Sequence, residues 1–170
     1  NSYLAKGKVR SRRQVLIYGA SGAIGTTAVQ LAKAFGAEVT GVCSTGNVEL
    51  VKSLGAAKVI DYTQTDTPPP GERYDLILDA VGKSKSSKLK ERCREALTAD
   101  GEYISVDDGS PKYALEELRL LNELVETGKL RAVIDRSYRL EEMVEAHRYV
   151  DQGHKKGNVV ITVGHDQASP

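Results

Sequence analysis

The sequence predicts an α/β fold, a doubly wound parallel sheet of about six strands with helices on both faces. Two observations predict it. Short apolar runs of strand length alternate with longer segments whose apolar residues recur at helical spacing. Glycines stand where several of the helical segments should end. Helices that join short buried strands imply right-handed parallel crossovers, and such crossovers build a sheet that is covered on both faces.

The first third of the chain is predicted to run strand, helix, strand, helix, strand. Residues 14–18 form a compact apolar run that ends at a glycine, as a buried parallel strand does. The helix that follows has apolar residues at helical spacing through Phe35, and Gly36 ends it. The other elements of this part are a strand at 38–43, a helix from Asn47 to Leu54 ended by Gly55, and a strand at 58–62.

The alternation continues after an interruption. Residues 63–73 contain three consecutive prolines, which exclude a long helix, so we predict an irregular loop there. The later elements are a strand at 75–79, a helix at 84–97, a strand at 102–106, an amphipathic helix at 115–127 stopped by Gly128, a short strand at 132–134, a helix at about 140–150 and a strand at 158–163.

A turn of small residues joins the first strand to the first helix. Small residues let the backbone turn tightly and approach a pyrophosphate, whose charge the free amides at the start of the helix would meet. Gly25 would let the helix pack close to the strand. Because the strand–turn–helix context of dinucleotide binding is present, a turn without a ligand is the weaker alternative. The predicted cofactor-binding residues here are Gly19, Ala20, Ser21, Gly22, Ala23, Ile24 and Gly25.

The end of the second strand bears on the choice between NAD and NADP. NAD-binding folds place a carboxylate about 20 residues beyond the glycines. Here the strand ends at Cys43 without a carboxylate, and the hydroxyls of Ser44 and Thr45 with amides near Asn47 would accept a 2′-phosphate. The sequence therefore favours NADPH, although Gly46 occupies the position at which an Arg or Lys would be the strongest indication of a 2′-phosphate. Capping of the next helix is the alternative role for the two hydroxyls.

Composition and charge exclude other classes of function. The 170 residues include 24 Lys and Arg against 23 Asp and Glu, and a net charge of +1 gives no basic surface for nucleic acid or an anionic membrane. Cys43 and Cys93 lack the spacing of a zinc site or a disulfide framework. No apolar run approaches a membrane span, and the N-terminus has no signal-peptide pattern. We expect a cytoplasmic protein with no metal, no nucleic acid partner and no membrane partner.

Two families use a glycine turn of this kind. Short-chain reductases also need a Tyr with a Lys four positions later, and no tyrosine here has one. The remaining pattern runs through residues 15–25, 28–33, 54–56, 59–62, 74–75, 79–82 and 153–160. It resembles the medium-chain dehydrogenase/reductase superfamily, specifically the zinc-free, quinone oxidoreductase-like branch, to which the name zinc-binding dehydrogenase is often attached.

The resemblance implies an NADPH-binding Rossmann domain of an oxidoreductase that transfers hydride to quinones, enones or carbonyl compounds. Residues 22–25 match its pyrophosphate turn, and Val81 with Gly82 match the turn beside the nicotinamide ribose. Ser44, Asn47 and Tyr62 fall where relatives contact the adenosine 2′-phosphate or adenine, and packing is the alternative role for Tyr62. Asn158 matches a residue that reaches the cofactor from the C-terminal segment. Beyond the glycine turn, the predicted cofactor residues are Cys43, Ser44, Thr45, Asn47, Tyr62, Ala80, Val81, Gly82 and Asn158. No catalytic residue is assigned.

The resemblance also implies a division of the chain. We predict a remnant of a lead-in helix at 1–10, an NAD(P)-binding Rossmann domain at 11–137, and a C-terminal helix–strand segment at 138–170. In relatives this segment packs with a substrate domain that is absent here, so the chain alone should be inactive or weakly active. A non-enzymatic nucleotide sensor and a fragment of a zinc alcohol dehydrogenase are the alternatives. We expect the last strand to extend the main sheet or to form a chain–chain contact, as in a homodimer.

Overall fold

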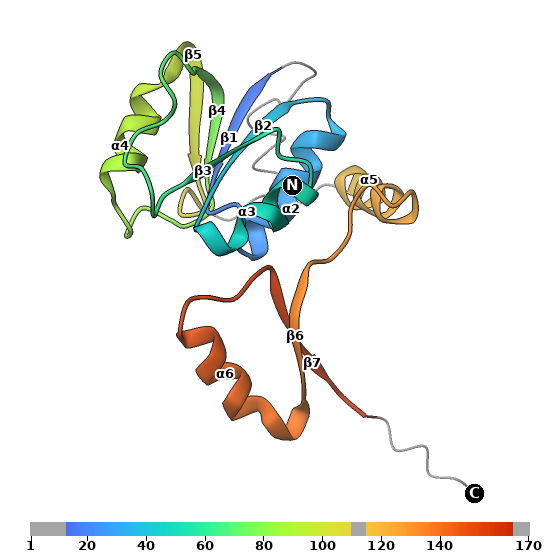
Figure 1. Cartoon of the computed structure of the whole chain (residues 1–170). Helices are drawn as coiled ribbons and strands as arrows, with labels where there is room; N and C mark the ends of the chain where they lie inside the picture. Colours follow the sequence, from blue (N-terminus) through green and yellow to red (C-terminus); the bar gives the residue numbers. More distant parts are fainter. Residues whose placement is uncertain (1–12, 110–114, 165–170) are drawn as a thin grey trace, which may run out of the picture.

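A parallel sheet of five strands forms the centre of the molecule, in the order β3-β2-β1-β4-β5 (Figure 1). The computed structural model describes residues 13–109 and 115–164, so the predicted lead-in helix at 1–10 lies outside the described residues. The order of the strands reverses beside β1, which leaves a crevice at the carboxyl ends of β1 and β4. The strands are β1 (Gln14–Tyr18), β2 (Glu38–Cys43), β3 (Lys58–Asp61), β4 (Tyr74–Asp79) and β5 (Leu97–Ser105).

Helices cover both faces of the sheet, as predicted. The larger cluster of buried side chains lies on the face of α2 (Ala23–Ala34), α3 (Val48–Ser53) and α5 (Leu115–Glu126). The other face carries α4 (Lys88–Glu95). In β1, Leu16 belongs to the α4 cluster, whereas Val15 and Ile17 belong to the α2 cluster. Because both faces are covered, β1 is apolar at successive positions, which explains the unbroken runs in the sequence.

The C-terminal unit is a separate two-stranded parallel sheet with one helix (Figure 1). It comprises β6 (Ile134–Arg139), the 3-10 turn Leu140–Glu142, α6 (Met143–Asp151) and β7 (Asn158–Thr162). The prediction of about six strands in one sheet is therefore corrected to five. The last strand does not extend the main sheet; it pairs in parallel with β6 in a sheet of its own. The division predicted at 137–138 stays a prediction, and β6 runs across it.

Two predicted boundaries shift for local reasons, and one predicted loop is confirmed. The helix expected from residue 84 begins at Lys88, since the Ser87 side chain accepts a hydrogen bond from the Lys90 amide at 3.1 Å and caps it. The strand expected at 102–106 begins earlier, at Leu97, where it pairs with Tyr74 before a register shift. The loop at 63–73 contains no helix or strand, as its prolines predict.

Candidate cofactor-binding site

The glycine turn is tied to the neighbouring strand at the carboxyl edge of the sheet. The amides of Gly19 and Ala20 both donate to the carbonyl oxygen of Val42, at 3.1 and 2.9 Å. Gly19 has φ +82°, a backbone conformation that residues other than glycine rarely adopt. The Ala20 side chain is fully buried in the core, so this residue supports the turn from the side of the core and does not line the site.

Gly25 allows α2 to start directly against this turn. A Cβ atom at Gly25 would stand 2.0 Å from the Gly19 carbonyl oxygen and 2.8 Å from the Ala20 backbone. No side chain fits there without moving the helix, which is the packing role that the sequence predicts for Gly25. The close approach fixes the direction in which the N-terminus of α2 points.

The N-terminus of α2 is open to an anion. Gly22 is its N-cap and makes no side-chain capping bond, and the first turn contains no acidic residue. The Thr26 amide donates to the Gly22 carbonyl at 2.9 Å, so the amides before Thr26 precede the hydrogen-bond ladder of the helix. A Cβ at Gly22 would meet only the Gly19 carbonyl oxygen, at 3.6 Å. An uncapped helix start beside open space is the arrangement that binds a pyrophosphate.

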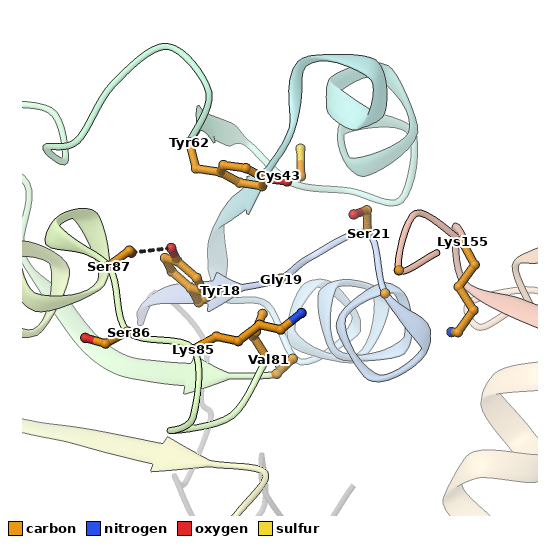
Figure 2. Close-up of a pocket in the computed structure, with 13 residues that line it drawn as sticks. Tyr18, Gly19, Ser21, Cys43, Tyr62, Val81, Lys85, Ser86, Ser87 and Lys155 are labelled. Carbon is orange, nitrogen blue, oxygen red and sulfur yellow. Dashed lines mark hydrogen bonds between the residues drawn. The ribbon is translucent and has the colours of Figure 1, made fainter. Parts of the chain in front are cut away.

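A hollow of about 480 Å³ lies beside the turn, where the carboxyl ends of β1, β2, β3 and β4 meet (Figure 2). Tyr62, Ala80 and Val81 are predicted cofactor residues that line this hollow. The aromatic ring after β3 and the valine after β4 therefore belong to one cavity. Its lining consists of Tyr18, Gly19, Ser21, Gly22, Cys43, Tyr62, Ala80, Val81, Lys85, Ser86, Ser87, Gly153 and Lys155.

The sequence prediction missed one wall of this hollow. The Tyr18 hydroxyl lies 2.8 Å from the Ser87 hydroxyl, and Lys85 extends along the same side (Figure 2). Burial, more than any other factor, raises the pKa of Tyr18, so its phenol stays protonated. Tyr18 ends β1 and Ser87 precedes α4. The rule that ligands bind at the carboxyl ends of strands could have identified both.

A second hollow of about 250 Å³ continues from Tyr62 towards the C-terminal unit. The side-chain nitrogen of Asn47, Nδ2, donates to the Ser21 hydroxyl at 3.2 Å and to the Ser44 hydroxyl at 3.1 Å. These bonds join the glycine turn to the end of β2. Ser44 makes no side-chain capping bond, contrary to its alternative role. The lining is Ser21, Ser44, Gly46, Asn47, Tyr62, Gly153, His154, Lys155 and Lys156.

The lysine loop, residues 153–157, supplies the positive charge that the turn after β2 lacks. Lys155 and Lys156 line the second hollow together with Ser44 and Asn47. The Gly157 amide donates to the Ser21 carbonyl at 2.8 Å and thereby fixes the loop to the glycine turn. Long-range folding thus brings both lysines to a hollow whose other residues lie far away in the sequence, and the Lys155 ammonium donates to the Gly157 carbonyl at 2.7 Å within the loop.

A carboxylate also reaches this region, which inspection of the second strand alone could not show. Asp61 ends β3 and pairs with Cys43 in the sheet, and it accepts a hydrogen bond from the Thr45 hydroxyl at 2.5 Å. That bond, together with bonds from Thr63, holds the pKa of Asp61 below its usual value. The Thr45 hydroxyl is therefore engaged by a carboxylate, and Thr45 lines neither hollow.

A buried ion pair fixes the turn after β4. The Lys90 ammonium lies 2.7 Å from the Asp79 carboxylate, and the two side chains are 7% and 0% exposed. Asp79 also accepts hydrogen bonds from the Tyr103 hydroxyl at 2.6 Å and from the amide of Gly82 at 3.1 Å. Burial alone would raise the pKa of Asp79, but these donors outweigh it and the pKa is lowered. The Gly82 amide is thus used within the turn and does not face the hollow.

Other predicted residues take supporting positions. The Asn158 side chain donates to the Val133 carbonyl at 3.2 Å and lines neither hollow. Ala23 and Ile24 form the start of α2, and Ile24 is exposed. Burial, its largest cause, raises the pKa of Cys43 to about 11, so this thiol is protonated at neutral pH. A role for Asn158 at the cofactor stays a prediction.

The described residues contain neither a metal-binding cluster nor a membrane-spanning helix. Residues 13–109 and 115–164 contain no group of three or more His, Cys, Asp and Glu side chains that could hold a metal ion. Within the same ranges, no helix has both the length and the apolar character needed to cross a membrane.

The reversed strand order, the glycine turn and the uncapped start of α2 define a dinucleotide-binding domain of the Rossmann type. Two sequence profiles, both described as zinc-binding dehydrogenase, match residues 23–106 and 110–161. The chain belongs to this family and corresponds to the C-terminal, nucleotide-binding part of medium-chain dehydrogenases/reductases.

Relatives of the chain are oxidoreductases. The 2-methylene-furan-3-one reductase of Solanum lycopersicum is 32% identical over 170 residues, which cover 93% of this chain and 42% of that protein. The chloroplastic NADPH-dependent alkenal/one oxidoreductase of Arabidopsis thaliana is 28% identical, with coverages of 93% and 42%. The solved quinone oxidoreductase from Coxiella burnetii matches with a TM-score of 0.84 and 28% identity, over 95% of this chain and 56% of that one. The chain spans about half the length of the curated relatives it matches.

Proposed function

We propose that this chain binds NADPH and forms the cofactor half of an oxidoreductase that transfers hydride to a quinone, an enone or a related carbonyl compound. One observation carries the proposal. The open N-terminus of α2 adjoins a hollow that extends from Tyr62 to Lys155 along the carboxyl edge of the sheet. The names of the relatives, an NADPH-dependent alkenal/one oxidoreductase and a quinone oxidoreductase, support the class of reaction.

The adenine ring is assigned to the larger hollow, between Tyr62 and Val81. Their side chains offer apolar contact to the faces of a flat base, and the paired hydroxyls of Tyr18 and Ser87 belong to the same hollow. This position for Val81 differs from the nicotinamide-ribose role that the family resemblance implies. The reason is that Val81 lines the same cavity as Tyr62, which is assigned to the adenosine half.

The phosphates follow from the adenine position. The pyrophosphate is assigned to Gly22 and the start of α2, where backbone amides and the helix dipole favour negative charge. The 2′-phosphate is assigned to the smaller hollow, because Ser44 and Asn47 offer polar groups there and Lys155 and Lys156 offer positive charge. These four residues support NADPH over NADH.

The side chains around the site bind and orient the cofactor. When bound, the nicotinamide ring supplies the hydride. The Asp79–Lys90 pair holds the turn that carries Val81, and the protonated Cys43 thiol provides a neutral wall. The proposal assigns no metal to this half, since the described residues offer no group of ligands for one.

Titration of the chain with NADPH and NADH by calorimetry tests the proposal. We expect NADPH to bind, and to bind more tightly than NADH. Gly22→Val should fold normally, because a Cβ at this position meets no atom closer than 3.6 Å. The variant should nevertheless weaken NADPH binding by roughly 100-fold or more, since its side chain fills the pyrophosphate position and removes contacts of about 3 kcal/mol.

Gly46→Val is a matched control, because a Cβ at Gly46 also meets no atom within 4 Å. Gly46 lines only the smaller hollow, so this change should affect NADPH much more than NADH. Absence of binding to both cofactors at millimolar concentration would refute the proposal. Unchanged affinity in Gly22→Val would show that the pyrophosphate is assigned to the wrong place.

A further inference from the structure

Asp135 lies at an irregularity in the C-terminal unit. In the pairing of β6 with β7, Ile134 is opposite Asn158 and Arg136 is opposite Val159, so the register shifts between Ile134 and Arg136. Asp135 is the extra residue at this shift. Such bulges redirect a side chain away from the face that regular alternation would give it.

The redirected carboxylate holds two parts of the unit at once. One oxygen, Oδ2 of Asp135, accepts a hydrogen bond from the Tyr149 hydroxyl at 2.5 Å and another from the Lys156 amide at 2.9 Å. Asp135 therefore connects α6 to the lysine loop. Burial would raise the pKa of Asp135, but these donors lower it overall, so the group is a carboxylate at neutral pH.

Tyr149 is itself held in place. The guanidinium of Arg136 lies 4.0 Å from the centre of the Tyr149 ring, and the Tyr138 ring centre lies 6.4 Å from it. These contacts orient the Tyr149 hydroxyl towards Asp135. The carboxylate thus accepts from a donor whose side chain has few alternative positions.

The lysine loop has a second attachment on its other side. The Gly157 amide donates to the Ser21 carbonyl at 2.8 Å, and Gly157 forms a β-bridge with Gly22. The two attachments fall on adjacent residues, Lys156 and Gly157, directly after Lys155. Asp135 fixes the loop to the C-terminal unit, and Ser21 with Gly22 fixes it to the glycine turn.

We propose that Asp135 is a positioning residue that sets the lysine loop for recognition of the cofactor's 2′-phosphate. This inference rests on the proposed function. Asp135 lines neither hollow; it holds the backbone of the loop whose Lys155 and Lys156 line the smaller hollow together with Ser44 and Asn47. Loss of the carboxylate frees the loop and removes preference for the phosphate-bearing cofactor, while the pyrophosphate turn is unchanged.

The test measures the ratio of the NADH and NADPH dissociation constants by calorimetry. Asp135→Ala should lower this ratio about tenfold through NADPH alone, the size expected for loss of a charge-assisted hydrogen bond. Asp135→Asn retains an acceptor oxygen and should restore most of the ratio. Tyr149→Phe removes one donor and should lower the ratio by about threefold.

Glu145→Ala is the matched control, because it removes one exposed carboxylate from α6, away from the loop. It should leave the ratio unchanged. Hydrogen exchange of the ligand-free protein gives a second measurement: the amides of Lys156 and Gly157 should exchange faster in Asp135→Ala, and those of β1 should not. In a Lys155→Ala/Lys156→Ala background, Asp135→Ala should lower the ratio no further.

Three results would overturn the inference, and they differ from failure of the proposed function. If the double lysine variant lowers the ratio but Asp135→Ala does not, the loop binds phosphate without help from Asp135. If neither variant changes the ratio, the loop does not recognise the phosphate. If Glu145→Ala lowers the ratio as much as Asp135→Ala, the effect is one of net charge. Failure of the unaltered chain to bind either cofactor would instead refute the proposed function.

Discussion

The sheet unit, β1 to β5 with its helices, and the C-terminal unit are stabilised in different ways. Val15, Leu16 and Ile17 of β1 are 0% exposed, and both faces of the sheet carry clusters of buried side chains. In the C-terminal unit, Ala146 is the one buried residue among the described residues of β6, α6 and β7. The sheet unit is therefore stabilised mainly by apolar burial.

The C-terminal unit depends on a few directional contacts with the sheet unit. The Gln30 side chain exchanges two hydrogen bonds with the Arg131 backbone, at 2.9 and 3.0 Å, just before β6. Gly157 adds its bond to Ser21. Segments with little apolar burial open at lower free energy than a core. The pyrophosphate turn thus belongs to the more stable unit and the lysine loop to the less stable one.

The largest expected effect is a loss of stability inside the sheet unit. Lys90→Met should lower the free energy of unfolding by about 3 kcal/mol or more, because it leaves the buried Asp79 carboxylate without its cation. Urea unfolding followed by circular dichroism measures the change. An effect below about 1 kcal/mol would show that the ion pair does not stabilise the sheet unit.

The same variant gives a pH dependence. The lowered pKa of Asp79 means that its contribution to stability is complete above the ordinary value of 3.8 and is lost as the pH falls through the folded-state pKa. The difference between the parent and Lys90→Met should therefore shrink below pH 3.8. A difference that stays constant into more acid solution would contradict the pairing.

A smaller effect should lower the local stability of the C-terminal unit and leave that of the sheet unit unchanged. Gly157 has φ +58°, and a Cβ there would lie 2.3 Å from the Val133 carbonyl oxygen. Gly157→Ala should speed hydrogen exchange in β6 and β7 by roughly tenfold, the change expected for loss of about 1.4 kcal/mol of local stability, and leave β1 unchanged. Gly153→Ala is the control, since its φ of +74° is also positive but its Cβ meets nothing within 4 Å. Equal exchange in the two variants would argue that the Val133 contact does not matter.

The smallest expected effect is on the affinity for NADPH relative to NADH. Asp61→Asn removes a negative charge next to Thr45, beside the proposed phosphate hollow. We expect NADPH to bind about threefold more tightly and NADH to be unaffected, with the gain reduced at high salt because the group is exposed. Calorimetry at two ionic strengths measures it. Equal gains for both cofactors would place the 2′-phosphate elsewhere.

Sequence patterns predicted those parts of the fold that depend on local residues. The run at 14–18, the small residues before α2 and the glycines at 36, 55 and 128 each determine their own conformation, and all of them appear in the structure where expected. The start of α4 was misplaced because capping by Ser87 prevails over the helical pattern that begins at Ser84. The pairing of β7 with β6 was missed because a parallel pair leaves no short-range turn signal.

The candidate site shows the same limit. Gly19, Ser21, Gly22, Ser44 and Asn47 were predicted because the glycine motif and its spacing identify them, and all five line a hollow. Asp61 and the lysine loop reach the site through strand pairing and docking of a distant unit. No pattern in one stretch of sequence contains that information.

The bridge between Gly22 and Gly157 has a consequence for the order of folding during synthesis. A ribosome releases the glycine turn early, together with the first strands, and domains fold from the N-terminus as they emerge. The lysine loop leaves the ribosome only after all five strands of the main sheet. Under the proposed function, a nascent chain would hold a pyrophosphate before it could distinguish one nicotinamide cofactor from another, and selectivity would be the last property that this fold acquires.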